Sequence, residues 1–264
     1  MIYWADLLYS APSHYNEDMS FDQLYSDEPY IEATPGALKS YDDGVLDGLR
    51  ALIQDAAGGI VDQTRRAFDL DFLAKFFLDK VVRDLSFYYD EDQKIKDRNG
   101  ALRLARAVLM DELASTLKPL KGREIMVIAH SMGSIIAYDV LRDLGRVDKT
   151  FEVANLVTIG SPLGFPTVKA NVLKEREGYA GKEAVRTPTI VTKDWTNFSD
   201  KKDPVAFDTH LNDDYGPNAK KIQVNDDLVS NDYVGRSGKA NHHKSYGYLR
   251  TPEMSEYIAK FLQA

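Results

Sequence analysis

The sequence predicts an α/β fold, with a mostly parallel sheet covered by helices on both faces. From residue 120 onward, short apolar runs alternate with segments whose apolar residues recur at helical spacing. This alternation favours a parallel sheet, because helical crossovers join its strands and bury both of its faces. The strands are expected at 124–129, 151–159, 189–196 and 221–224.

Helices are expected between and after these strands. Residues 133–144 carry apolar side chains at helical spacing directly after the first strand. The last helix is expected at 251–262, because Pro252 is favoured at the first helical position. Gly160, Ser161 and Pro162 end the second strand.

The N-terminal part has a different pattern. Residues 1–9 mix aromatic and aliphatic side chains and predict a short strand, and the polar stretch 10–35 predicts a loop. Helices are expected at 43–55, 61–89 and 101–117.

The helix at 61–89 has an unusually wide apolar face that includes Phe68 and Leu85. It could be a core helix packed on the sheet or a cap that binds an acyl chain. We therefore expect one domain over 1–264, with a helical insertion or cap at about 43–118.

Composition excludes several classes of function. The chain has 264 residues, 44% of them apolar, and a net charge of −8, which gives no general attraction to nucleic acid or anionic membranes. Without cysteine there is no disulfide, thiol nucleophile or thiolate metal site. The first residues lack the pattern of a signal peptide, and no apolar run approaches the ~20 residues that span a bilayer. We expect a cytoplasmic protein without a transmembrane segment.

The segment around Ser131 has the pattern of a nucleophile elbow. A strand, a tight turn and a helix would push the serine hydroxyl clear of the backbone. Small residues two positions before and after it, Ala129 and Gly133, are expected to prevent clashes. The Met132 N–H at the helix N-terminus is the expected oxyanion donor. His130 is expected to point away from Ser131 and to pack or line the pocket.

The base and the acid should follow the serine in the order Ser, Asp or Glu, His. His242 and His243 lie together just before the last helix, and we prefer His243 as the base. Asp203 follows the third strand and is the preferred acid, with Asp200 as its rival and Asp208 less favoured. Because adjacent histidines rarely ligate one ion, no metal site is expected, and the chemistry needs no cofactor.

These residues occur in four motifs that resemble lipase-like α/β hydrolases, including bacterial esterases and lipases and relatives of the glycosylphosphatidylinositol inositol-deacylase group. The motifs span roughly residues 123–250 and are Ala129-His130-Ser131-Met132-Gly133, Thr158-Ile159-Gly160-Ser161-Pro162-Leu163, Asp203-Pro204-Val205 and His243-Lys244-Ser245-Tyr246. The resemblance implies an α/β-hydrolase fold with Ser131 as nucleophile, Asp203 as acid and His243 as base. It also implies that Met132 is an oxyanion donor and that the 160–163 turn borders the acyl pocket.

One departure from the family concerns the second oxyanion donor. Such hydrolases usually carry a His-Gly loop after an early strand, and this sequence has no His-Gly pair. The chain is therefore expected to lack the first strand and its loop, or to use another segment such as residues 8–14. A missing edge strand would leave an exposed sheet edge that favours a homo-oligomer.

The sequence thus predicts a serine esterase or lipase-like hydrolase acting on a small-molecule or lipid-like ester. Two alternatives remain. The chain could be a weak or silent α/β-hydrolase scaffold that binds a ligand or partner, as the absent His-Gly loop suggests. It could also transfer the acyl group to an acceptor other than water.

Overall fold

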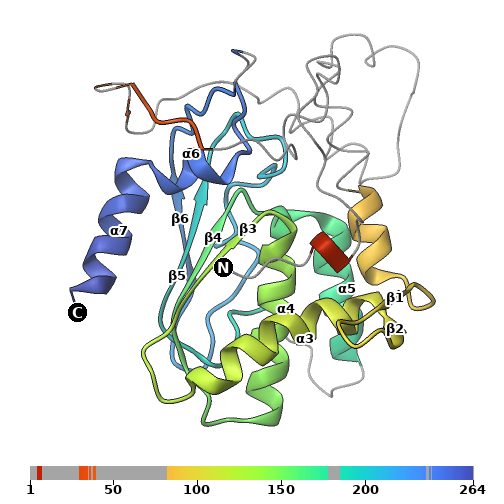
Figure 1. The fold of residues 1–264 in the computed structure, drawn as a ribbon. Coiled ribbons are helices and arrows are strands. Elements are labelled where there is room, and N and C mark those ends of the chain that lie inside the picture. The colour runs from red at the N-terminus through yellow and green to blue at the C-terminus, as the bar shows by residue number, and fades with distance from the viewer. Residues whose placement is uncertain are drawn as a thin grey trace.

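The computed structural model of the chain describes residues 5–7, 30–34, 36, 38–39, 82–177, 185–235, 238 and 240–263. Its main feature is a parallel sheet of four strands in the order β3-β4-β5-β6 (Figure 1). The bounds are Met126–His130 for β3, Val153–Ile159 for β4, Val191–Ser199 for β5 and Val224–Leu228 for β6. The predicted parallel sheet is confirmed, although β5 and β6 extend beyond their predicted ends.

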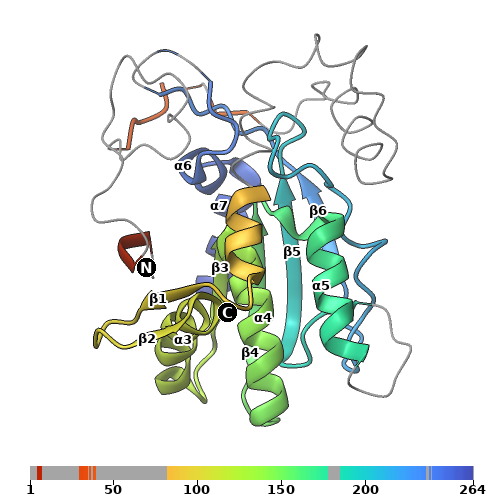
Figure 2. The same ribbon diagram turned by 90° about the vertical axis from the view of Figure 1, so that its right-hand side faces the viewer.

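Helices cover both faces of this sheet (Figures 1 and 2). One face carries α3, α4 and α5, and the opposite face carries α6 and α7. The bounds are Ala105–Leu117 for α3, Met132–Val147 for α4, Pro166–Glu177 for α5, Ser245–Leu249 for α6 and Pro252–Leu262 for α7. The start predicted for the last helix is confirmed, since Thr251 caps α7 and Pro252 is its first residue.

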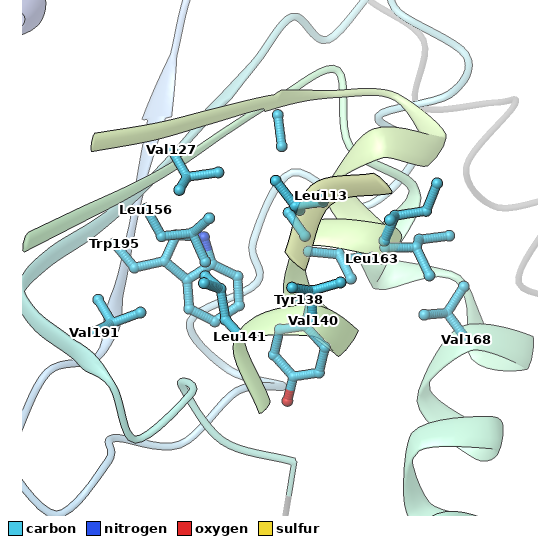
Figure 3. Close-up of a cluster of buried hydrophobic side chains, with 14 of the residues drawn as sticks. Leu113, Val127, Tyr138, Val140, Leu141, Leu156, Leu163, Val168, Val191 and Trp195 are labelled. Carbon is cyan, nitrogen blue, oxygen red and sulfur yellow. The ribbon is translucent and has the colours of Figure 1, made fainter. Parts of the chain in front are cut away.

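Alternation along each strand supplies two hydrophobic cores. Leu156 and Trp195 belong to the large core under α3, α4 and α5 (Figure 3), whereas Val157 and Phe198 belong to a smaller core with α6 and α7. Successive side chains of a strand point to opposite faces, so neighbouring residues serve different cores. This two-sided burial explains why β3 and β4 are nearly continuous apolar runs, whereas β5 and β6 carry more polar side chains.

A buried ion network holds α4, the helix that follows Ser131. Asp139 of α4 accepts hydrogen bonds from Tyr88 at 3.0 Å, from Arg106 of α3 at 2.6 Å and from Arg142 at 3.2 Å. Both arginines also pair with Glu175 of α5. Burial raises the pKa of Asp139, and the two guanidinium groups oppose that effect. The network thereby joins α3, α4 and α5.

Two N-terminal predictions are wrong where the structure describes the residues. Ala5–Leu7 forms a 3-10 turn, η1, instead of part of a strand. Residues 101–104 are not helical, because β2 (Leu102–Leu104) pairs antiparallel with β1 (Lys94–Lys96) and the chain turns at Gly100 with φ of 81°. Helix α3 therefore begins only at Ala105.

Short elements absent from the prediction complete the described fold. They are η2 (Lys118–Leu120), η3 (Pro162–Gly164), α5 and α6. In α5, Val168 and Val172 are fully buried while most of the sequence is polar, so its periodicity is weak. The single turn of α6 is too short to give a helical pattern.

The predicted insertion at 43–118 is described only in part. Residues 82–89 are helical, and Leu85 and Tyr88 belong to the large core. The helix predicted at 43–55 and residues 61–81 of the next one lie outside the described residues. The choice between a core helix and a cap for 61–89 stays a prediction.

Candidate active site

Ser131 forms a tight turn between β3 and α4. Its φ of 54° and ψ of −134° are unusual for a residue with a side chain, and only Lys221 shares a positive φ among the described non-glycine residues. Backbone strain of this kind costs free energy and persists where the surroundings enforce it. Here the Ser131 N–H donates to the carbonyl of Ile159 in β4 at 3.1 Å, which fixes the turn to the neighbouring strand.

Three side chains form a hydrogen-bonded chain at the carboxyl end of the sheet. His243 Nε2 lies 2.9 Å from Ser131 Oγ, and His243 Nδ1 lies 3.0 Å and 2.9 Å from the two oxygens of Asp203. His243 and Asp203 are buried, whereas Ser131 is half-buried. These contacts fit the tautomer with its proton on Nδ1, leaving Nε2 to accept the serine proton.

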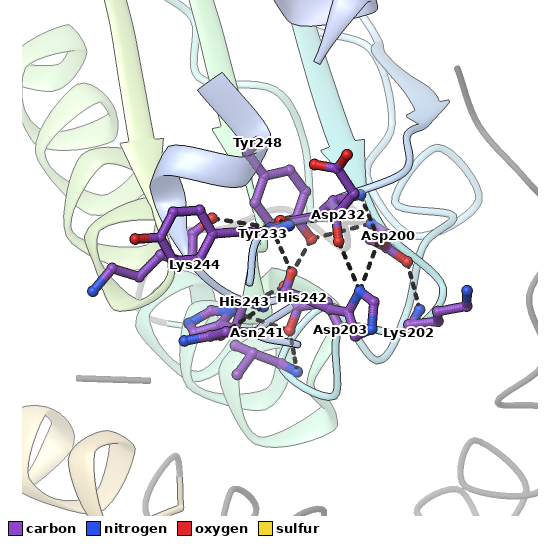
Figure 4. A network of polar contacts seen from close by, with 12 residues as sticks. Asp200, Lys202, Asp203, Asp232, Tyr233, Asn241, His242, His243, Lys244 and Tyr248 are labelled. Carbon is purple, nitrogen blue, oxygen red and sulfur yellow. Dashed lines mark hydrogen bonds and ion pairs between the residues drawn. The ribbon is translucent and has the colours of Figure 1, made fainter. Parts of the chain in front are cut away.

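Asp203 is held by donors from two sides (Figure 4). The Val205 N–H donates to Oδ1 at 2.8 Å, and the Tyr248 hydroxyl donates to Oδ2 at 2.7 Å. Burial opposes its ionisation, but His243, Tyr248 and the Val205 N–H together hold the pKa of Asp203 below its usual range. Asp203 is therefore a carboxylate at neutral pH.

The backbone around His243 is fixed by buried amides. The Asn231 side-chain amide donates to the carbonyl of His242 at 2.7 Å and to that of Lys244 at 3.0 Å. The His243 N–H donates to Asn241 Oδ1 at 3.2 Å. These contacts bracket His243 and hold its ring toward Ser131.

The rival acid and the rival base contact each other instead of Ser131. His242 Nδ1 donates to the Asn231 carbonyl at 2.7 Å and lies 3.5 Å from Asp200. Burial opposes the charge on His242, but Asp200 and the Asn231 carbonyl raise its pKa. The adjacent His242 and His243 thus belong to two separate pairs, His242 with Asp200 and His243 with Asp203.

Asp208, the third acid considered, lies away from these pairs. Its carboxylate accepts from the His210 N–H at 3.0 Å. Burial, with a contribution from Asp214, raises the pKa of Asp208 to about 6. Nothing in its described contacts connects it to His243.

His130 packs against the base. Its Nε2 donates to the His243 carbonyl at 2.7 Å, and the centroids of the two rings are 4.6 Å apart. Burial, followed by the neighbouring His243 ring, lowers the pKa of His130 from 6.5 to about 3. His130 is therefore an uncharged donor at neutral pH.

We expect His130 to make the fold sensitive to acid. Between pH 6.5 and 3 the unfolded chain binds a proton here that the folded chain does not. The free energy of unfolding therefore decreases as the pH is lowered through this window, by up to about 1.4 kcal/mol per pH unit. His130→Gln keeps a donor but cannot titrate, so its loss of unfolding free energy from pH 7 to 5 should be about 2 kcal/mol smaller than in wild type. Urea unfolding at both pH values measures this, with the exposed His210→Gln as control. Equal losses in His130→Gln and wild type would contradict the expectation.

The surroundings of the elbow differ from the prediction at one position. Met132 is the first residue of α4, so its N–H lies at the helix N-terminus. A Cβ added at Gly133 would meet nothing within 4 Å, so the expectation that glycine prevents a clash there is wrong. Residues 8–14, named as an alternative source of the second oxyanion donor, lie outside the described residues.

Sequence reasoning missed Tyr248 and Asn231, and it placed Gly160 only in a turn that borders the acyl pocket. Gly160 has φ of 52°, and a Cβ there would lie 2.7 Å from Asp203 Oδ2 and 3.2 Å from His243 Nδ1. Its place directly after a buried strand marked a turn but not this close approach. Tyr248 and Asn231 carry no local motif that could have identified them.

In the part of the chain that the structure describes, no group of three or more His, Cys, Asp or Glu side chains could hold a metal ion. Across the same residues, no helix combines the length and apolar character needed to cross a bilayer.

Comparisons with known proteins give only distant likenesses. No protein-family model matches the chain, and no curated protein matches it significantly. Human thioesterase 2 is similar in structure, with 17% identity, a TM-score of 0.31, and coverage of 58% of this chain and 78% of that one. A protein described as a cell surface hydrolase, from Lactobacillus plantarum WCFS1, has 12% identity, a TM-score of 0.35, and coverage of 72% and 91%.

The topology of the chain defines its fold. A parallel sheet lies between two helical layers, and a strained serine turn joins β3 to α4. An aspartate follows β5, and a histidine follows β6 in a late loop. That order of elements is the order of the α/β-hydrolase fold. The chain has an α/β-hydrolase fold.

Proposed function

We propose that the chain is a serine hydrolase that cleaves a carboxylic ester through an acyl-enzyme on Ser131. The observation that carries the proposal is the continuous chain of hydrogen bonds from Ser131 Oγ through His243 to Asp203. A serine hydroxyl is a weak nucleophile at neutral pH and needs an adjacent base to act. The strained turn at Ser131 and the buried Asp203–His243 pair support this role.

In the first half of the reaction, Ser131 Oγ attacks the carbonyl carbon of the ester while His243 Nε2 takes its proton. A carbon–oxygen bond forms, and the carbonyl π electrons move onto the oxygen. The Met132 N–H at the start of α4 would stabilise this oxyanion. When the tetrahedral intermediate collapses, the bond to the alcohol breaks and His243 protonates the departing oxygen.

In the second half, a water molecule repeats the sequence against the acyl-enzyme. His243 takes a proton from the water as it attacks, and then returns a proton to Ser131 Oγ. Asp203 stays ionised throughout and stabilises the imidazolium that forms twice per cycle. No redox step is involved, and the products are a carboxylic acid and an alcohol.

Labelling with a fluorophosphonate tests the proposal, because this probe phosphonylates an activated serine. We expect wild-type protein, labelled as the folded full chain, to gain one adduct, which peptide mapping after digestion should locate on Ser131. Ser131→Ala should remain unlabelled, whereas Ser115→Ala, which removes an exposed serine of α3, should label like wild type. A wild-type chain that stays unlabelled beside a reactive control hydrolase would favour a silent scaffold instead.

Product analysis separates hydrolysis from acyl transfer. With a p-nitrophenyl ester and a competing alcohol, hydrolysis yields the free acid as the main product. A dominant new ester would instead assign the chain as an acyltransferase that uses the same serine.

A further inference from the structure

The Tyr248 hydroxyl lies between the two aspartates of the loop after β5 (Figure 4). It is fully buried, donates to Asp203 Oδ2 at 2.7 Å and accepts from the Asp200 N–H at 3.1 Å. A backbone N–H can only donate, so the phenol oxygen is the acceptor there. The proton of Tyr248 is therefore directed at Asp203.

This phenol keeps its proton at neutral pH and into the alkaline range. Burial raises the pKa of Tyr248 well above 10, and the nearby carboxylate of Asp203 adds to the effect. Tyr248 is thus a permanent neutral donor. Tyr248 touches no reacting atom, because it contacts Asp203, which binds His243 on the side opposite Ser131.

We propose that Tyr248 is a positioning residue that sets the orientation of Asp203 and the negative charge that Asp203 presents to His243. The inference rests on the proposed function and goes beyond it. Asp203 Oδ2 is shared, since His243 Nδ1 lies 2.9 Å from the same oxygen that accepts from Tyr248. Each hydrogen bond to a carboxylate stabilises its charge and leaves less of that charge for other partners.

Removing the hydroxyl should therefore have two effects. Asp203 Oδ2 would carry more uncompensated charge, so the His243 imidazolium would be favoured and the acid limb of the pH–rate profile would move to higher pH. Asp203 would also be held by one donor fewer, so the plateau rate would fall by about tenfold, the scale of one hydrogen bond to a charged group.

Other titratable side chains face this site, and the compared variants must keep all of them unsubstituted. They are His130 on β3, Asp200 and Lys202 in the loop after β5, and His242 and Lys244 in the loop before α6. None of them is replaced when Tyr248 is substituted, although the Asp200 N–H loses its contact with the phenol oxygen. A displaced acid limb in that variant would therefore report the loss of the phenol.

The experiment compares Tyr248→Phe with Tyr257→Phe in the full chain. Tyr257 on α7 is a matched control, because its hydroxyl also donates to a carboxylate, that of Asp194 at 2.5 Å, but Asp194 lies in the first half of β5 and not beyond its carboxyl end. The rate of fluorophosphonate labelling at Ser131 is measured from pH 4 to 9. We expect Tyr248→Phe to shift the acid limb upward by about 0.5 pH unit and to lower the plateau by about tenfold. Tyr257→Phe should follow wild type.

A second variant covers the case in which Tyr248→Phe fails to fold. Site-specific 3-fluorotyrosine at position 248 keeps the hydroxyl but makes it a stronger donor, so the acid limb should move to lower pH. If wild type is labelled and the acid limb is unmoved in every Tyr248 variant that folds, this inference alone is overturned. An unlabelled wild type would overturn the proposed function as well.

Discussion

Replacing Asp203 with asparagine is expected to lower kcat for ester hydrolysis by about 10⁴-fold while leaving the fold intact. The Val205 N–H donates to Oδ1 at 2.8 Å and can only donate, whereas the Tyr248 hydroxyl on Oδ2 can rotate and accept, so the amide oxygen of the new residue is expected at the Oδ1 position. Its NH₂ group then replaces Oδ2 and faces His243 Nδ1. The imidazole would be held with its proton on Nε2, where it cannot accept the proton of Ser131.

The matched substitution is Asp200→Asn, three residues away and also buried. Asp200 pairs with His242 and accepts from the Asn231 N–H at 2.6 Å, so its loss loosens the histidine loop without changing the His243 tautomer. We expect a loss of about tenfold or less. The two variants are compared by their initial rates with a p-nitrophenyl ester, and thermal melts verify that both are folded. A larger loss for Asp200→Asn would assign the acid to Asp200.

The elbow could be predicted from sequence because its determinants are local. A buried strand, Ser131 and an amphipathic helix follow each other within about twenty residues, and the period changes from strand to helix at the serine. Chain order and their positions after strands predict Asp203 as the acid and His243 as the base. Their placement against Ser131 depends on how the sheet brings the ends of β3, β5 and β6 together.

The supporting contacts could not be predicted, because they join segments that are distant in sequence. Tyr248 reaches Asp203 across 45 positions, and Asn231 holds carbonyls 11 and 13 positions away. A buried tyrosine or asparagine has no periodic signature that separates it from an ordinary loop residue. The same limit explains the error at 101–104, where pairing with β1 overrode an apparently helical continuation.

The second large effect is expected at Gly160, where the backbone passes beside both Asp203 and His243. A Cβ at this position would lie 2.7 Å from Asp203 Oδ2 and 3.1 Å from the ring of Tyr248. Asp203 cannot swing away freely, since Val205 and Tyr248 hold its two oxygens. Gly160→Ala should therefore displace the acid and base from Ser131 and lower kcat by about 10²-fold, as expected for a misplacement near 1 Å.

Backbone strain must be separated from this displacement, because Gly160 has a positive φ of 52°. Gly122→Ala is the control: its φ is 84°, and an added Cβ there would meet nothing within 4 Å. Both variants should lose stability through strain, by about 1–2 kcal/mol, but only Gly160→Ala should also lose activity in its folded fraction. Urea unfolding measures the loss of stability, and the rate per folded molecule measures the loss of activity. If the two variants kept equal activity per folded molecule, the close approach at Gly160 would have no part in arranging Asp203 and His243. If they differ as expected, the space that glycine leaves after β4 is a requirement of catalysis and not only of the turn.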